Sequence, residues 1–311
     1  MKLSIVIPCY NEEDVLPETT RRMTELLDQM VREQLVSEDS EMLFVDDVSR
    51  DKSWSLIEEF SRENPYVHGV KLAGNSGHQN ALMAGMFTVK EYADVVVTVD
   101  ADLQDDISVI PDMIHKYNDG CDIVYGVRKE RKTDTVFKRV TAQGFYRLMN
   151  KFGVKSVYNH ADFRLMSRRA VCQLCEYRER NLYLRGIVPL IGYKTDAVYY
   201  DRAERFAGES KYSLSKMVNL AVDGITSFSV KPVRMLITLG MIFMFISLLI
   251  FIYVIYALIS HRAAAGWASV MLSIWFVGGC ILHGLGIVGE YIGKIYIEVK
   301  DRPRYNIEKR V

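Results

Sequence analysis

Two long uncharged segments near the C-terminal end constrain this chain more than any other feature. Residues 235–260 and 267–289 contain no Asp, Glu, Lys or Arg. Each is long enough to cross the hydrocarbon core of a bilayer, which is about 30 Å thick, and only residues 261–266 separate them. The alternative is a pair of buried helices in a soluble domain, but neither segment has the polar face that such helices show. We therefore predict a transmembrane hairpin.

Lysine and arginine residues flank this predicted hairpin unevenly. The connecting loop contains only Arg262, whereas the outer ends of the two segments are rich in positive charge. These outer residues are Lys216, Lys231, Arg234, Lys294, Lys300, Arg302, Arg304, Lys309 and Arg310. Because positive residues favour the cytoplasmic side of a membrane, we expect the preceding domain and both termini to be cytoplasmic. No secretory signal opens the chain, since residues 1–8 form a short predicted strand.

Residues 1–128 alternate short apolar runs with longer amphipathic stretches, which is typical of a parallel sheet covered by helices. The expected strands are residues 3–8, 42–45, 67–72, 95–99 and 122–126. Ligands of such sheets bind beyond the carboxyl ends of the strands. The chain has neither a Gly-x-Gly-x-x-Gly turn nor a Gly-x-x-x-x-Gly-Lys-Ser/Thr loop, which argues against the usual dinucleotide and P-loop sites. Its 39 basic and 39 acidic residues balance, so nothing indicates a nucleic-acid partner.

The predicted strand at residues 95–99 ends in two carboxylates, Asp100 and Asp102. Residues i and i+2 at the frayed end of a strand can converge on one point. Mg²⁺ is typically held by one or two carboxylates and completed by phosphate oxygens and water. This pair is therefore suited to binding a metal–diphosphate. The alternative is an acidic, solvated turn after a strand.

Several segments resemble, in order, the motifs of the GT-A family 2 glycosyltransferases. They are residues 5–12 (IVIPCYNE), 45–51 (VDDVSRD), 75–79 (NSGHQ) and 100–104 (DADLQ). Two more segments and the two-helix C-terminal anchor resemble the polyprenyl-phosphate branch, which includes dolichyl-phosphate mannose synthase and the bactoprenol glucosyltransferases. These are residues 161–165 (ADFRL) and 205–212 (RFAGESKY). The resemblance spans essentially the whole chain.

The resemblance implies an α/β fold: a GT-A, Rossmann-like catalytic domain with a mostly parallel sheet, amphipathic interface helices and a two-helix transmembrane hairpin. The expected boundaries are 1–210 for the cytoplasmic catalytic domain, 211–234 for a juxtamembrane amphipathic helix, 235–289 for the membrane helices and 290–311 for a cytoplasmic C-terminal segment. The chain departs from the family where Asp105 and Asp106 follow Gln104, because many members have a His or Asp and then two prolines there. We expect this departure to alter a loop only.

The resemblance assigns Asp46 and Asp47 to nucleotide binding, where carboxylates can accept hydrogen bonds from a base N–H or from ribose hydroxyls. A helix-capping turn before residues 53–60 is the alternative, and both roles are compatible. The metal held by Asp100 and Asp102 would be Mg²⁺ or Mn²⁺, which oxygen ligands separate poorly. The expected donor-binding residues are Pro8, Tyr10, Asn11, Glu12, Asp46, Asp47, Gly77, Gln79, Asp100, Ala101, Asp102 and Gln104.

Asp162 occupies the position of the catalytic base proposed for the family. A phosphate monoester has a second pKa of about 6 and is largely dianionic at neutral pH, so a phosphate acceptor needs little proton removal. The alternative role for Asp162 is therefore to orient Arg164 or to weaken acceptor binding.

Three basic residues complete the expected catalytic set. Arg128, at the end of the strand at 122–126, is expected to hold a phosphate through its planar guanidinium; a solvated side chain in the basic run 128–132 is the alternative. Arg205 and Lys211 flank a glycine-containing loop that can close over phosphates. Their alternative role is attraction to anionic lipid headgroups.

These expectations predict a metal-dependent, inverting glycosyltransferase in a bacterial inner membrane. It would move one sugar, glucose from UDP-glucose by family analogy, to undecaprenyl or another polyprenyl phosphate at the cytoplasmic face. Glycines between residues 278 and 293 permit close helix contacts, as in a homo-oligomer. A processive polysaccharide synthase would need a Gln-x-x-Arg-Trp motif, which the chain lacks. A non-catalytic membrane scaffold is the other alternative, and the retained carboxylates argue against it.

Overall fold

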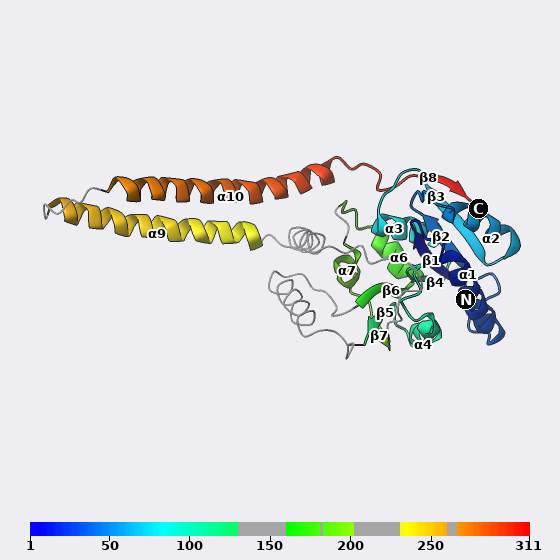
Figure 1. The fold of residues 1–311 in the computed structure, drawn as a ribbon. Coiled ribbons are helices and arrows are strands. Elements are labelled where there is room, and N and C mark those ends of the chain that lie inside the picture. The colour runs from blue at the N-terminus through cyan, green and yellow to red at the C-terminus, as the bar shows by residue number, and fades with distance from the viewer. Residues whose placement is uncertain (130–159, 181–182, 202–230, 260–265) are drawn as a thin grey trace.

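The computed structural model describes residues 1–129, 160–180, 183–201, 231–259 and 266–311. Figure 1 shows an α/β domain from which two long helices, α9 (Lys231–Ile259) and α10 (Trp267–Val299), project side by side. Both termini lie on the α/β domain. The chain therefore returns to this domain after α10.

One sheet forms the centre of the domain, and its described strands follow the order β7-β5-β6-β4-β1-β2-β3-β8. β1 pairs in parallel with β2 and β4, β2 with β3, and β5 with β7. β6 and β8 run antiparallel to their neighbours. The predicted mostly parallel sheet is confirmed. The strands are β1 (Leu3–Cys9), β2 (Glu41–Asp46), β3 (Val67–Leu72), β4 (Val95–Thr98), β5 (Ile123–Arg128), β6 (His160–Ser167), β7 (Thr195–Tyr200) and β8 (Ile307–Arg310).

Helices cover both faces of this sheet. One hydrophobic core joins it to α1, α2 and α4, and a second joins it to α3, α6 and α7. Because both faces are covered, all residues of β1 and β4 are buried, as continuous apolar strands require. The domain helices are α1 (Leu16–Arg32), α2 (Ser53–Glu63), α3 (His78–Val89), η1 (Ile107–Val109), α4 (Ile110–Asn118), α6 (Arg168–Cys175), α7 (Leu184–Ile187) and η2 (Val188–Ile191).

A glycine allows α3 to pack closely on the sheet. A Cβ atom added at Gly85 would lie 2.3 Å from Cγ1 of Val6 and 2.9 Å from Cγ2 of Val45. Such distances are well inside van der Waals contact, so a larger residue would push the helix away from β1 and β2. This close packing fixes the N-terminal end of α3 beside the carboxyl ends of the same strands.

The last residues of the chain add an edge strand to the sheet. β8 pairs with β3, with Arg310 opposite Val70 and Ile307 opposite Leu72. Val311 and Gly69 exchange backbone hydrogen bonds of 2.8 and 2.9 Å. Nothing noted in the sequence predicted this strand, which lies within the segment assigned to 290–311. Its charged, exposed residues are typical of a sheet edge.

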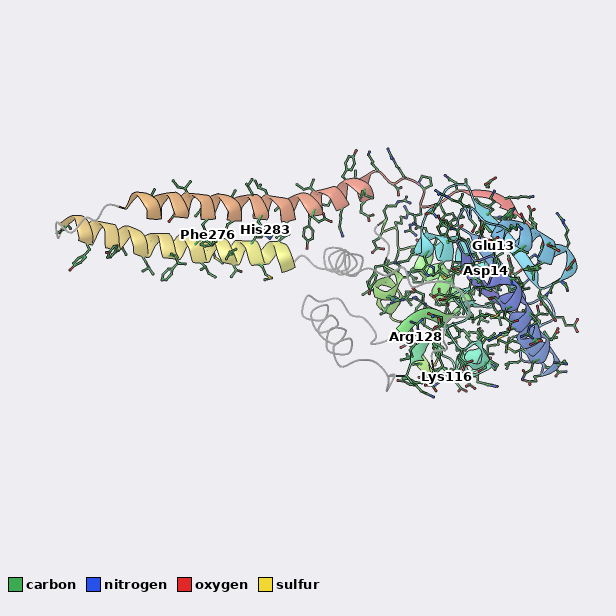
Figure 2. All side chains as sticks on the ribbon, viewed as in Figure 1. Glu13, Asp14, Lys116, Arg128, Phe276 and His283 are labelled. Atoms are coloured by element: carbon green, nitrogen blue, oxygen red, sulfur yellow. The ribbon has the colours of Figure 1, made fainter. Side chains whose placement is uncertain are left out.

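Both uncharged segments are helical, as predicted. α9 and α10 pack through Phe243 and Phe276, whose rings meet edge to face with centroids 5.7 Å apart; Figure 2 labels Phe276. Within the described residues, one helical segment, Phe276–Val299, is long and apolar enough to cross a membrane, and none of it is buried in the protein. The predicted juxtamembrane helix at 211–234 falls outside the described residues up to position 230.

Candidate active site

A cavity of about 420 Å³ opens at the carboxyl ends of β1, β2 and β4. This is the edge of the sheet at which the sequence predicted the site. The predicted residues that line it are Pro8, Tyr10, Glu12, Asp47, Asp100, Ala101, Asp102 and Asp162. The predicted residues Asn11, Asp46, Gly77, Gln79, Gln104 and Arg128 lie outside this lining.

The backbone turns sharply where these three strands end. Asn11, Val48 and Leu103 have φ angles of 55°, 62° and 54°. Positive φ is costly for a non-glycine residue, and for a β-branched valine in particular. Asn11 adopts this conformation readily, whereas Val48 and Leu103 hold a conformation that they disfavour, as is common where a fold positions a site.

Hydrogen bonds fasten the turn after β1 to the loop after β2. Ser49 Oγ accepts from the backbone N–H of Asn11 at 3.0 Å, and Ser53 Oγ accepts from that of Glu12 at 2.9 Å. The side-chain oxygen of Asn11 accepts from the backbone N–H of Arg50 at 2.8 Å. Asn11 thus shapes the wall of the cavity beside β1 and β2 from outside its lining.

Asp47 and Asp46 accept hydrogen bonds from different segments of the chain. The two carboxylate oxygens of Asp47 accept from the backbone N–H groups of Ser76 and Gly77 at 2.6 and 2.8 Å. Asp47 therefore fixes the N-terminal end of α3, while the carboxylate of Asp51 accepts from the backbone N–H of Ser53 at the start of α2. Asp46 is fully buried, accepts from the N–H of Ser49 at 3.2 and 3.3 Å, and has its pKa raised by burial.

Asp100 has a buried carboxylate oxygen that accepts no hydrogen bond from the described residues. This atom, Oδ1, lies 3.5 Å from Nε2 of His78. Burial raises the pKa of Asp100 to about 6, His78 opposes the rise, and the carboxylates of Asp162, Asp105 and Asp102 add to it. A buried anionic oxygen without a donor is costly, and a cation or a ligand hydroxyl would satisfy it.

The donor set fits a hard divalent cation. Asp100 and Asp102 supply oxygen ligands of the kind that Mg²⁺ and Mn²⁺ prefer. Within the described part of the chain, no group of three or more His, Cys, Asp or Glu residues could hold a metal ion. A metal held by this pair would need further ligands, for which phosphate oxygens and water are typical.

Asp162, on β6, lies in a cluster of positive groups. Its Oδ1 accepts from Nη2 of Arg164 at 2.6 Å, and its Oδ2 accepts from Nη2 of Arg185 at 3.1 Å. His78 Nε2 lies 3.7 Å from Oδ2. Burial would raise the pKa of Asp162, but Arg185, His78 and Arg164 outweigh it and hold that pKa well below its usual range. The contact with Arg164 is the one that the orienting alternative predicted.

Arg128 forms a buried pair with Asp105. Oδ1 of Asp105 accepts from Nε and Nη2 of Arg128 at 3.0 and 2.8 Å and from the hydroxyl of Tyr200 at 2.6 Å. Asp105 therefore links the segment after β4 to β5 and β7. The side chain of Arg128 is 21% exposed and is held by Asp105, so it is not the freely solvated side chain of the alternative.

Gln79 and Gly77 act on the backbone around the cavity. Oε1 of Gln79 accepts from the backbone N–H of Leu184 at 2.8 Å, which ties α3 to α7. Gly77 has a φ of 85° immediately before α3. Gln104 is buried, and its backbone N–H donates to Asp102 Oδ1 at 3.2 Å. Arg205 and Lys211 lie outside the described residues.

Sequence reasoning missed two positively chargeable side chains that line the cavity, His78 and Arg185. His78 lies inside segment 75–79, but only Gly77 and Gln79 of that segment were predicted to bind the donor. Asp162 and Asp100 raise the pKa of His78 against the lowering effect of burial. Arg185 belongs to no segment that carried the resemblance, and only the fold brings it to Asp162.

Residues 4–174 match the family model described as Glycosyl transferase family 2. Among solved structures, the chain is similar to the mannosyltransferase PcManGT from Pyrobaculum calidifontis in complex with GDP-Man and Mn²⁺, at 12% identity over 97% of this chain and 88% of that one, with a TM-score of 0.44. It is 56% identical to the uncharacterized glycosyltransferase YkoT of Bacillus subtilis over 98% of this chain and 91% of that protein. It is also 40% identical to the SfII prophage-derived bactoprenol glucosyl transferase of Shigella flexneri over 99% of this chain and 98% of that protein. The family match and these two relatives show that the chain belongs to glycosyl transferase family 2.

Proposed function

We propose that this enzyme transfers a single glucose from UDP-glucose to a polyprenyl phosphate, with inversion at the anomeric carbon. The observation that carries the proposal is the 40% identity, over 99% of this chain, to a bactoprenol glucosyl transferase. A likeness of that extent includes both long helices as well as the catalytic domain. The cavity supports the proposal because its acidic edge is suited to a metal–diphosphate.

The donor would lie across the carboxyl ends of β2, β1 and β4. Tyr10, Glu12 and Asp47 line the part of the cavity suited to the nucleoside. Asp100 and Asp102 would hold Mg²⁺ or Mn²⁺, which supplies positive charge to the departing diphosphate. The raised pKa of Asp100 fits this role, because a bound cation replaces the proton that burial otherwise favours.

The attacking atom would be an oxygen of the lipid phosphate. That oxygen forms a bond to the anomeric carbon, while the bond from this carbon to the donor diphosphate breaks and the diphosphate leaves with the electron pair. No proton has to be removed, because the acceptor is largely dianionic at neutral pH. Asp162 has a strongly lowered pKa, so it is a weak base. Orienting the two arginines beside it suits Asp162 better than proton abstraction.

We also propose that α9 and α10 both span the membrane, with the catalytic domain and both termini on the cytoplasmic side. Support comes from the exposed apolar residues of both helices, among them Leu248, Ile252, Leu282 and Leu285, and from the excess of Lys and Arg at the outer ends. In that position Arg205 and Lys211 would meet acceptor phosphate near the headgroups. Glycines along the exposed face of α10 support a homo-oligomer.

The test is transfer to a defined lipid. The purified full-length protein would be incubated with a short-chain polyprenyl phosphate, Mn²⁺ or Mg²⁺ and one nucleotide sugar at a time. We expect the lipid to gain the mass of one hexose with UDP-glucose, as measured by mass spectrometry. Gain only with another nucleotide sugar would correct the donor, a ladder of products would indicate a polymerase, and no gain with any donor would refute the proposal.

A further inference from the structure

Among the described residues, Arg185 is the arginine whose side chain lines the cavity. Arg128, the arginine predicted to hold a phosphate, pairs with Asp105 outside the lining. Arg185 lies on α7, its side chain is 36% exposed, and it contacts Asp162 through Nε at 3.3 Å and Nη2 at 3.1 Å. This side-on contact aligns the guanidinium plane with a fixed carboxylate.

The negative charge of the cavity means that a phosphate needs a positive group such as Arg185 in order to bind there. Its lining includes the carboxylates of Glu12, Asp47, Asp100, Asp102 and Asp162. A phosphate dianion that entered this space would be repelled at short range. A metal at Asp100 and Asp102 offsets part of that charge beside the donor, whereas an acceptor phosphate arriving from another direction needs a positive group of its own.

The order of strands indicates which phosphate Arg185 meets. Across this edge the neighbouring strands are β2, β1, β4 and β6. The residues suited to the nucleoside follow β2 and β1, and the metal pair follows β4. Asp162, on β6, and its partner Arg185 therefore lie one strand beyond the diphosphate, on the side opposite the nucleoside. An in-line displacement requires the attacking phosphate to approach the anomeric carbon from the side opposite the departing diphosphate, and a donor that lies across β2, β1 and β4 would leave that side open toward β6.

The segment before α7 is held by the end of α10. Both carboxylate oxygens of Glu298 accept from the backbone N–H of Arg180, at 2.7 and 2.9 Å, and the side chain of Arg180 pairs with Asp301. Arg304 donates to the backbone oxygen of Tyr177. Figure 1 places α7 on the side of the domain from which α9 and α10 project. Arg185 thus lies where the helical hairpin meets the catalytic domain.

We propose that Arg185 binds the phosphate of the lipid acceptor and that Asp162 positions it for this contact; the inference rests on the proposed function. A guanidinium has five N–H donors in a fixed fork, so it can bridge the Asp162 carboxylate and a phosphate oxygen. The adjacent carboxylate also limits how tightly a phosphate is held, which favours release of the product once its phosphate has lost a negative charge to the new bond.

The test separates acceptor binding from donor binding in the full-length protein. Binding of a short-chain polyprenyl phosphate and binding of UDP with Mn²⁺ would each be measured by calorimetry for wild type, Arg185→Gln and Arg185→Lys. Arg62→Gln is the matched control, because Arg62 is exposed on α2 and does not line the cavity. Thermal unfolding would check that each variant folds.

We expect Arg185→Gln to weaken polyprenyl-phosphate binding by about tenfold or more, the size of a lost charge-assisted hydrogen bond, and to raise the acceptor KM similarly. UDP binding should stay within about twofold of wild type, and Arg185→Lys should recover part of the loss. Unchanged lipid binding would overturn the inference, and so would a loss confined to UDP. If Arg185→Gln fails to fold, Arg185→Lys decides by the same two measurements. If the wild type transfers no sugar but Arg185→Gln still weakens lipid binding, the proposed function is refuted and the inference about Arg185 is not.

Discussion

Asp100 and Asp102 concentrate negative charge directly after β4, a strand that is buried throughout. Burial of β4 keeps both carboxylates at a fixed place, and the positive φ of Leu103 turns the chain away directly after them. The buried oxygen of Asp100 accepts no hydrogen bond among the described residues. The residues of this turn are therefore better suited to a cation than to a solvated loop.

Replacing Asp102 by Asn tests the metal pair. Asp102→Asn should abolish sugar transfer while leaving the thermal unfolding midpoint close to wild type, because it removes a charged ligand and preserves the shape of the side chain. Asp106→Asn is the matched control, since Asp106 caps η1 through Ser108 and asparagine caps equally well. Normal turnover of Asp102→Asn would show that the metal assignment is wrong.

The low pKa of Asp162 makes a prediction about pH. Its carboxyl is ionised throughout the range from pH 5 to 8, because Arg185, His78 and Arg164 outweigh the effect of burial. Titration of Asp162 should therefore contribute no slope to the dependence of kcat on pH in that range. Asp162→Asn should lower kcat and raise the acceptor KM without changing the shape of the profile. A slope in the wild type that disappears in Asp162→Asn would identify Asp162 as a base.

Among the secondary-structure elements, the first strands of the sheet could be predicted from sequence. So could the edge at which they end, because apolar runs and polar turns are local patterns. Tyr10, Glu12 and Asp47 follow such strands, and they line the cavity at this edge. The link from Asp105 to Arg128 and Tyr200 could not be predicted, because it joins three segments that are distant in sequence. β8 was not predicted because a short, charged edge strand lacks the alternation of apolar and polar residues that marks a strand in a sequence.

Asp122 joins β5 to β6 and should govern stability in acid. Its carboxylate accepts from Ser167 Oγ at 2.8 Å and from Arg169, and Arg169 lowers the pKa of Asp122. A lowered pKa stabilises the fold above the unfolded value of about 3.9, and this stabilisation is lost as pH falls through the folded value. Asp122→Asn should cost about 1–3 kcal/mol of unfolding free energy at pH 7. Chemical denaturation should show this difference shrinking below pH 4; a constant difference would contradict it.

The contact between α10 and the segment before α7 should affect lipid use more than nucleotide use. Glu298→Gln weakens the two bonds to Arg180 N–H, by about 1 kcal/mol. We expect the acceptor KM to rise severalfold, with the Kd for UDP and Mn²⁺ unchanged. Glu290→Gln is the control, because Glu290 lies on the same helix and is exposed. Equal kinetics for the two variants would show that α10 does not position α7.

At the scale of the whole molecule, the chain leaves the catalytic domain, forms a hairpin of two long helices and returns to the sheet as β8 (Figure 1). Lys309 bonds to Glu58 of α2 at 2.6 Å, and Lys71 lies 3.2 Å from Glu308. The chain that follows α10 is thereby tied to the same domain that precedes α9. Attachment at both ends restricts how the cavity can tilt relative to the hairpin, which suits the proposed transfer to a lipid acceptor.

The measurement that tests this account most directly is metal-dependent sugar transfer to a lipid phosphate in a single reaction. Wild-type protein would be stripped with a chelator, assayed with UDP-glucose and a short-chain polyprenyl phosphate, and assayed again after Mn²⁺ is restored. We predict no hexose gain on the lipid in chelator and full recovery with Mn²⁺. Full activity in chelator, or no transfer after the metal is restored, would contradict a mechanism in which Asp100 and Asp102 hold a cation beside the departing diphosphate.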